Sequence, residues 1–281
     1  MLIDTHSHLN FNAYKEDVDE VIRRSLENDI WMINVGSQYT TSKKAVEIAG
    51  KYEAGVYAAV GLHPIHLAEG IFKVKMDEEE TSFQTKNENF DYEEYKKLAN
   101  SQKVVAIGEI GLDYYYKPKT KRRLEIFKEK QRTGLCQQLK LVKELGLPVI
   151  FHCRMAHQDL IEILNLQLTT YNLQLKGVMH GFVGTVEQLK EYLKMNFYIG
   201  FNGIIFKKIK GIDFEENIRN TPLDKILIET DCPYLTPPQT EGRNEPLNVK
   251  YVAEKISQIK NLNPKEIARI TTENAKKLFS I

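Results

Sequence analysis

The sequence predicts an α/β fold, a (β/α)8 TIM barrel built as a single domain over residues 1–281. Eight short apolar runs alternate with longer segments that have apolar residues at helical spacing. The runs are nearly continuous in apolar residues, which is typical of parallel strands covered by helices. The length of 281 residues suits eight such units, because a barrel of this class needs about 250. A doubly wound open sheet is the competing arrangement.

The elements follow in a regular order. Strands are expected at 2–5, 31–36, 56–64, 104–113, 148–153, 177–182, 197–206 and 225–233. Helices around 14–27 and 41–53 follow the first two strands, and helices at about 247–260 and 264–279 close the chain. The clearest helix is 121–145, which Gly146 and Pro148 end in the usual way. Residues 65–90 break the alternation and are expected to be a loop insertion after strand three.

Composition excludes several classes of protein. The net charge is +1, so any binding of a polyanion has to come from a local patch. No N-terminal segment has the charged-then-apolar pattern expected of a signal peptide, and no apolar run approaches the ~20 residues that a membrane helix needs. Cys136, Cys153 and Cys232 are widely spaced and fit a reducing compartment better than a disulfide framework. A cytoplasmic protein, or a nuclear one in a eukaryote, is expected, with no membrane partner and no obligate protein partner evident.

Titratable residues gather where the predicted strands end. Because the carboxyl ends of barrel strands form the active face, these residues are expected to share one rim. Five of the seven histidines lie there together with two carboxylates, namely His6, His8, His63, His152, His180, Glu109 and Asp231. A single histidine at such a position is more often structural, but imidazoles and carboxylates that converge on one pocket suit a divalent metal.

The spacing predicts how the ligands divide between two ions. Residues i and i+2 of a strand point the same way, so His6 and His8 can bind one ion together with Glu109 and Asp231. His152 and His180 would bind a second ion that shares Glu109 as a bridge. The strand VVAIGEIGLD has no lysine that could serve as the bridge instead. Zn²⁺, Mn²⁺ and Mg²⁺ all accept such ligands. Asp4 is one step deeper than His6 and is expected to support the site without binding metal.

At these residues the chain resembles the TatD family of metal-dependent deoxyribonucleases. The matching stretches are DTHSHLNF, GLHP, GEIGLDYY, FHCR, HGFVGT, IETDCPYLTPP and GRNEP, in family order from residue 4 to residue 246. The resemblance implies the same ligand set, His6, His8, Glu109, His152, His180 and Asp231. It also implies a 3′–5′ exonuclease or another nuclease of DNA repair or DNA fragmentation. Gly181 and Met155 depart from the family pattern, which leaves the fine substrate preference open.

The expected reaction is hydrolysis of DNA phosphodiester bonds by a metal-activated water. Glu109 would act as the bridge, and Asp231 would orient the water or take its proton, or would be a ligand only. The substrate phosphate is expected to contact Arg154, His63, Lys207, Arg243 and Asn244. Arg243 and Asn244 could equally staple their loop, and His63 could be structural. Tyr114, Tyr115 and Tyr116 could stack an unpaired base, although packing at the rim is favoured.

Three other functions use the same residues. A small-molecule amidohydrolase or lactonase would direct the activated water to a cyclic amide or lactone, and an aminoacyl-tRNA deacylase would direct it to an ester. A metal-binding scaffold without catalysis is the third. The cationic Arg154, Lys207 and Arg243 favour a phosphate substrate.

Overall fold

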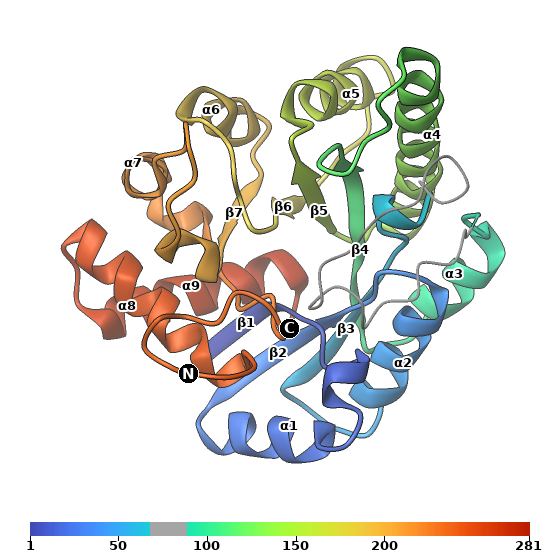
Figure 1. Ribbon diagram of the computed structural model, residues 1–281. Helices are drawn as coiled ribbons and strands as arrows, with labels where there is room; N and C mark the ends of the chain where they lie inside the picture. Colours follow the sequence, from blue (N-terminus) through green and yellow to red (C-terminus); the bar gives the residue numbers. More distant parts are fainter. Residues whose placement is uncertain (68–88) are drawn as a thin grey trace.

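Eight parallel strands form one sheet in the order β1 to β8, so every strand pairs with its neighbours in the sequence (Figure 1). This arrangement comes from a computed structural model that describes residues 1–67 and 89–281. The strands are β1 Leu2–Ser7, β2 Ile30–Val35, β3 Val56–Val60, β4 Val104–Asp113, β5 Val149–Arg154, β6 Gly177–Met179, β7 Tyr198–Phe201 and β8 Ile226–Ile228. A parallel bridge between Ser7 and Cys232 links the end of β1 to the segment after β8 and completes the ring. The predicted barrel is confirmed.

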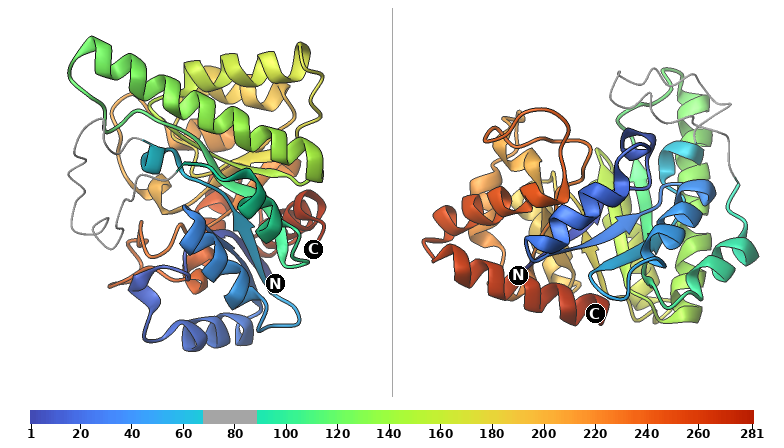
Figure 2. Two further views of the ribbon diagram at one scale, coloured as in Figure 1. Left: turned by 90° about the vertical axis from the view of Figure 1, so that its right-hand side faces the viewer. Right: turned by 90° about the horizontal axis from the view of Figure 1, so that it is seen from below.

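Helices connect the strands and cover the outside of the ring (Figures 1 and 2). They are α1 Val18–Glu27, α2 Tyr39–Ala49, α3 Tyr92–Ala99, α4 Lys121–Leu145, α5 His157–Thr169, α6 Val186–Lys194, α7 Phe214–Asn220, α8 Val249–Lys260 and α9 Pro264–Phe279. Short 3-10 helices are η1 Asn12–Tyr14, η2 Pro64–Leu67, η4 Gly203–Phe206, η5 Leu223–Lys225 and η6 Pro246–Asn248. The helices 121–145 and 264–279 have the predicted bounds. Gly146 ends α4 at φ 67°, a left-handed conformation that glycine adopts without steric cost.

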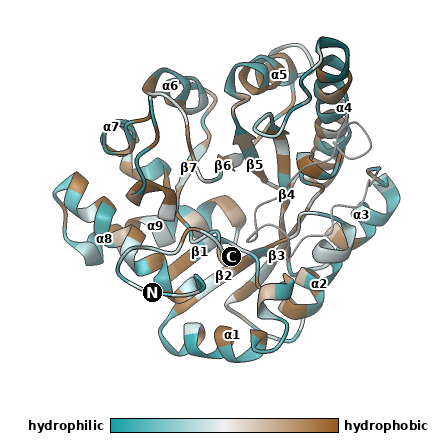
Figure 3. Cartoon of the chain, in the orientation of Figure 1, coloured by the Kyte–Doolittle hydropathy of each residue, from teal (hydrophilic) through white to brown (hydrophobic). Residues whose placement is uncertain are grey.

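Two apolar layers hold the barrel together. The larger layer lies between strands and helices, so the strands are apolar and the outer faces of the helices are hydrophilic (Figure 3). The smaller layer contains inward-facing strand residues together with Leu278 and Phe279 of α9. Asn274 of α9 also donates hydrogen bonds to the carbonyls of Leu223 and Ile226, next to the start of β8. Because α9 covers the amino ends of the strands, the carboxyl ends are left for a functional site.

Several strands are shorter than the sequence predicts. The third strand ends at Val60, four positions before its predicted end at 64. The seventh and eighth end at Phe201 and Ile228, each five positions before the predicted ends at 206 and 233. After β7 the side chain of Asn202 accepts a hydrogen bond from Ile204 N–H and starts the turn η4. After β8 the backbone of Asp231 has φ 58°, which is incompatible with a strand. His63, His180 and Asp231 therefore lie in loops just beyond strand ends.

The predicted insertion 65–90 falls almost entirely on residues 68–88, which lie outside the described residues. Its described ends are the last residues of η2 and the pair Asn89–Phe90. Among the helices of the described residues, none is long and apolar enough to cross a membrane.

Candidate metal centre

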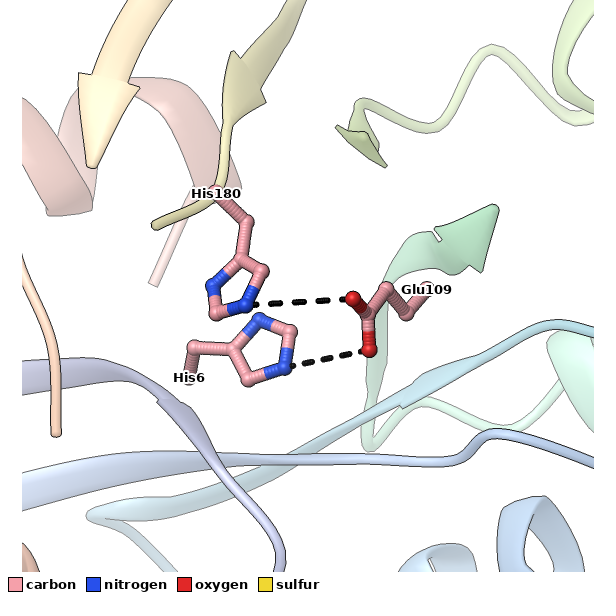
Figure 4. A group of neighbouring side chains, drawn as sticks. All are labelled: His6, Glu109 and His180. Carbon is pink, nitrogen blue, oxygen red and sulfur yellow. Dashed lines mark ion pairs between the residues drawn. The ribbon is translucent and has the colours of Figure 1, made fainter. Parts of the chain in front are cut away.

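All six predicted metal ligands belong to one cluster at the carboxyl ends of the strands. Three groups of candidate ligand atoms lie within 4.8 Å of one another, and together they contain the six predicted ligands and also His63 and Asp113. The groups are His6–Glu109–His180, His6–His8–Asp231 and His63–Asp113–His152. In Figure 4, His6 from β1 and His180 from the end of β6 both point to Glu109 of β4. Apart from Asp231 and His152, which are partly exposed, the predicted ligands are buried. The sequence therefore brings together on one rim residues up to 225 positions apart.

Backbone hydrogen bonds hold the two ends of the ring in register at this point. The Asp231 N–H donates to the His6 carbonyl at 2.8 Å, and the His8 N–H donates to the Cys232 carbonyl at 2.9 Å. Asp4 strengthens the junction, because its carboxylate accepts hydrogen bonds from the N–H and hydroxyl of Thr230 and from the His6 N–H. These contacts agree with the expected supporting role of Asp4, which acts by joining β1 to the loop after β8.

Glu109 occupies the centre of the cluster. Its Oε2 lies 3.5 Å from His6 Nε2, while its Oε1 lies 2.5 Å from His152 Nδ1 and 3.8 Å from His180 Nε2. The two oxygens thus face the two predicted ligand sets. Burial alone would raise the pKa of Glu109, but His63, His152 and His6 outweigh it and hold the pKa well below its usual range. A carboxylate that stays charged between two sets of imidazoles can bridge two cations.

The outer nitrogen of each ring indicates which tautomer the histidine adopts. His8 Nδ1 lies 2.8 Å from the Val35 carbonyl, and His180 Nδ1 lies 2.7 Å from Glu229 Oε1. Both acceptors require a proton on Nδ1, so the lone pair of the neutral ring is on Nε2, which faces Asp231 in both cases. Metal ligands in proteins are commonly oriented in this way.

His63 has the opposite arrangement. The Ile65 N–H donates to His63 Nδ1 at 3.1 Å, so the neutral ring carries its proton on Nε2, 3.7 Å from Glu109 Oε1. Burial lowers the pKa of His63 to about 3, which keeps the ring neutral. His63 is therefore suited to donate a hydrogen bond into the pocket, whereas His8 and His180 are suited to bind metal.

Asp113 is a buried carboxylate at the end of β4 that the sequence reasoning missed. The side chain of Gln131 holds both the N–H and the carbonyl of Asp113, and the Tyr115 N–H donates to its Oδ1 at 2.8 Å. Its Oδ2 lies 3.2 Å from His152 Nε2. Because this contact fixes the proton on Nε2, it leaves Nδ1 of His152 to face Glu109. The four-residue spacing from Glu109, which puts both on one face of a strand, is the signal that could have identified it.

Glu229 is the second missed residue, a fully buried carboxylate that contacts His180 and accepts a hydrogen bond from the Gly181 N–H. Burial alone would lower the pKa of His152 and His180, yet Glu109 beside the first ring and Glu229 beside the second outweigh it. They raise these pKa values to about 9 and about 10. Burial likewise opposes charge on Asp231, but His180, His8 and His6 keep its pKa below the usual range.

The structure separates the predicted phosphate contacts into two kinds. Arg154 ends β5, and Lys207 is exposed after η4, so both lie at the rim with His63. Arg243 instead forms ion pairs with Asp17 and Glu245.

Asn244 is 0% exposed, and its amide donates to the carbonyls of Thr230 and Tyr234 and accepts from the Glu245 N–H. These contacts, together with the ion pairs of Arg243, favour the alternative in which Arg243 and Asn244 staple their loop.

The aromatic and cysteine positions differ in exposure. Tyr114 is buried and donates a hydrogen bond to Asp159 at 3.0 Å, as packing at the rim predicts. Tyr115, in contrast, is 48% exposed. Cys153 and Cys232 are buried and all three cysteines are free thiols.

Replacing Asp113 with asparagine is expected to weaken metal binding by roughly 10–100-fold, because a neutral amide no longer fixes the orientation and basicity of His152. The measurement is calorimetric titration of the apoprotein with Zn²⁺ or Mn²⁺. Asp224→Asn, at an exposed position, is the matched control. Unchanged affinity in Asp113→Asn would show that Asp113 does not position a metal ligand.

Comparison with known proteins gives consistent matches over the whole chain. Residues 3–280 match the family model for TatD related DNase. The uncharacterized metal-dependent hydrolase YabD of Bacillus subtilis is 41% identical, with 100% of both chains covered. The 3'-5' ssDNA/RNA exonuclease TatD of Citrobacter koseri is 30% identical, with 100% of this chain and 99% of the relative covered. The solved structure of YJJV, a TatD homologue from Escherichia coli K12, superposes with a TM-score of 0.79 at 27% identity, covering 100% and 98% of the two chains.

Proposed function

Since this chain belongs to the TatD related DNase family of metal-dependent hydrolases, we propose that it is a deoxyribonuclease. It hydrolyses phosphodiester bonds of DNA, acting as a 3′–5′ exonuclease in DNA repair or DNA fragmentation. The name of the Citrobacter koseri relative, a 3'-5' ssDNA/RNA exonuclease, supports this choice of substrate and polarity.

The single observation that carries the proposal is the position of Glu109 between two sets of imidazoles. One set contains His6 and His8 with Asp231, and the other contains His152 and His180. The donors fit divalent cations, because the neutral rings of His8 and His180 carry their lone pairs on the inner nitrogens and the carboxylates are charged. When bound, two such ions supply an activated water at neutral pH and neutralise charge on phosphoryl oxygens.

The remaining groups fit a phosphodiester. His63 Nε2–H donates a hydrogen bond to a phosphoryl oxygen, and Arg154 and Lys207 add positive charge at the same rim. The side chain of Asp231 is 19% exposed, against 6% for Glu109, so it is the carboxylate most open to water. This exposure supports a role for Asp231 in orienting the attacking water and holding its proton.

The test is hydrolysis of end-labelled single-stranded and double-stranded DNA by the purified protein. EDTA should abolish hydrolysis, and add-back of Mn²⁺, Mg²⁺ or Zn²⁺ should restore it, with a ladder that shortens from the 3′ end. Amide and lactone substrates and a charged tRNA belong in the same panel. Metal-dependent turnover of one of these, with intact DNA, would overturn the proposal in favour of the small-molecule hydrolase or the deacylase.

A further inference from the structure

A group of two aromatic rings and one guanidinium, in which Tyr115 is exposed and Tyr116 and Arg154 are partly buried, stands beside the metal centre. Arg154 lies over the ring of Tyr115 at 3.6 Å from its centroid, and the Tyr116 ring meets Tyr115 edge-on at 4.8 Å. We call Tyr115, Tyr116 and Arg154 the stacking platform. Next in sequence to Arg154, Met155 is 64% exposed, and Tyr115 is 48% exposed. Two large apolar side chains are thus exposed to solvent at the same part of the rim.

The stacking platform is tied to the metal ligands through the backbone. Asp113 and Arg154 are paired residues at the ends of the neighbouring strands β4 and β5. Asp113 accepts the Tyr115 N–H through one oxygen and faces His152 through the other. The Tyr114 N–H donates to the Arg154 carbonyl at 2.9 Å. A ligand that stacks on Tyr115 would therefore be held at a fixed position relative to His152 and Glu109.

A basic segment follows the stacking platform directly. Between residues 117 and 123, in the loop before α4 and in its first turn, five of seven residues are cationic and none is acidic, namely Lys117, Lys119, Lys121, Arg122 and Arg123. All five are exposed. Within the described residues, none of these five side chains forms an ion pair. The next cation along α4, Lys128, does form one, with Asp159. The net charge of the chain is only +1, so this segment is a local concentration of positive charge.

We propose that the stacking platform and the basic segment 117–123 form a binding surface for single-stranded nucleic acid next to the metal centre. The inference rests on the proposed function and adds to it the residues outside the metal centre that hold the unpaired strand. Tyr115 stacks an unpaired base, while the five cations follow the phosphates of neighbouring nucleotides. An aromatic side chain beside a positively charged track is the combination that proteins use for single strands without sequence preference. Bases inside a duplex are already stacked on each other, so the surface favours a single-stranded or frayed end.

The first test removes the aromatic ring. Tyr115→Ala is expected to weaken binding of a hydrolysis-resistant phosphorothioate oligonucleotide about tenfold, as measured by fluorescence anisotropy. Tyr171→Ala is the matched control, because Tyr171 is 57% exposed just beyond the end of α5, away from the rim. The second part of this test uses a set of oligonucleotides that each have one base replaced by an abasic site. In one of them the missing base is the one that stacks on Tyr115, and wild type and Tyr115→Ala should bind that oligonucleotide with equal affinity. If Tyr115→Ala weakens binding of every oligonucleotide in the set to the same degree, Tyr115 does not stack a base.

The second test removes charge from the basic segment. Lys117→Gln/Lys119→Gln should reduce the slope of log affinity against log salt by about 1.4, because each phosphate contact to a single strand contributes about 0.7. The matched control is Lys140→Gln/Lys143→Gln, two exposed lysines about 30 Å further along α4. Hydrolysis of bis(p-nitrophenyl) phosphate, a diester without neighbouring bases or phosphates, should stay unchanged in all these variants.

The outcomes separate the two proposals. If the wild-type protein neither binds nor hydrolyses DNA, the proposed function fails and the inference fails with it. If wild type hydrolyses DNA while Tyr115→Ala and Lys117→Gln/Lys119→Gln behave like their controls, only the inference is wrong. Loss of bis(p-nitrophenyl) phosphate hydrolysis in Tyr115→Ala would assign the residue to the metal centre and would also contradict a separate binding surface.

Discussion

Replacing Glu109 with glutamine is expected to abolish DNA hydrolysis, a fall on the order of a thousandfold or more, and to leave the protein soluble. The amide keeps the shape of the side chain but removes the charge that faces His6 through one oxygen and His152 through the other. Without that charge the two ligand sets share no bridging group, so the metal content should fall together with the rate. The measurements are the rate on end-labelled single-stranded DNA and metal content by mass spectrometry.

The matched control is Glu53→Gln, which removes one carboxylate charge at an exposed position. It should keep wild-type activity and metal content. Full nuclease activity of Glu109→Gln in the presence of metal would contradict the bridging role. Circular dichroism of both variants distinguishes loss of the site from loss of the fold.

Asp231→Asn is the second substitution with a large expected effect, a decrease in kcat of roughly a hundredfold or more. Asp231 lies 3.3 Å from His8 Nε2, its pKa is lowered by the surrounding histidines, and it is the most exposed carboxylate of the centre. The substitution therefore removes a proposed ligand and also the group that we propose holds the proton of the attacking water. The decisive measurement is kcat over a range of metal concentrations.

Metal saturation separates the two roles of Asp231. If Asp231 orients the water as well as binding metal, kcat should stay low when excess Mn²⁺ has restored the wild-type metal content. If saturating metal returns kcat to the wild-type value, Asp231 is a ligand only. Asp224→Asn again serves as the exposed control.

The fold could be predicted from the sequence because its signals are local. A parallel strand that is covered on both faces appears in the sequence as a run of apolar residues. The helix α4 appears as apolar residues at helical spacing followed by a glycine, so its bounds follow from neighbouring residues. The ends of β7 and β8 could not be predicted in this way. Their apolar runs continue past the ladder, where the Asn202 side chain and the left-handed Asp231 turn the backbone away.

The sequence was sufficient to predict which residues gather at the candidate site, but not how their side chains contact one another. Histidines and acids at strand ends identify the candidate ligands, since strand ends converge on the rim of any barrel. The positions of Asp113 and Glu229 beside the histidines, and the tautomer of His63, were not accessible, because they depend on which nitrogen of a ring meets which partner across strands. The ion pair of Arg243 could not be predicted either, since its partner Asp17 lies 226 positions away in the sequence.

The central claim is that Glu109 bridges two cations held by His6, His8 and Asp231 on one side and by His152 and His180 on the other. Anomalous diffraction from crystals of the protein grown with Mn²⁺ tests it most directly. The account predicts two anomalous peaks ~3.5–4 Å apart, one on each side of the Glu109 carboxylate. A single peak, or peaks that do not contact Glu109, would contradict it.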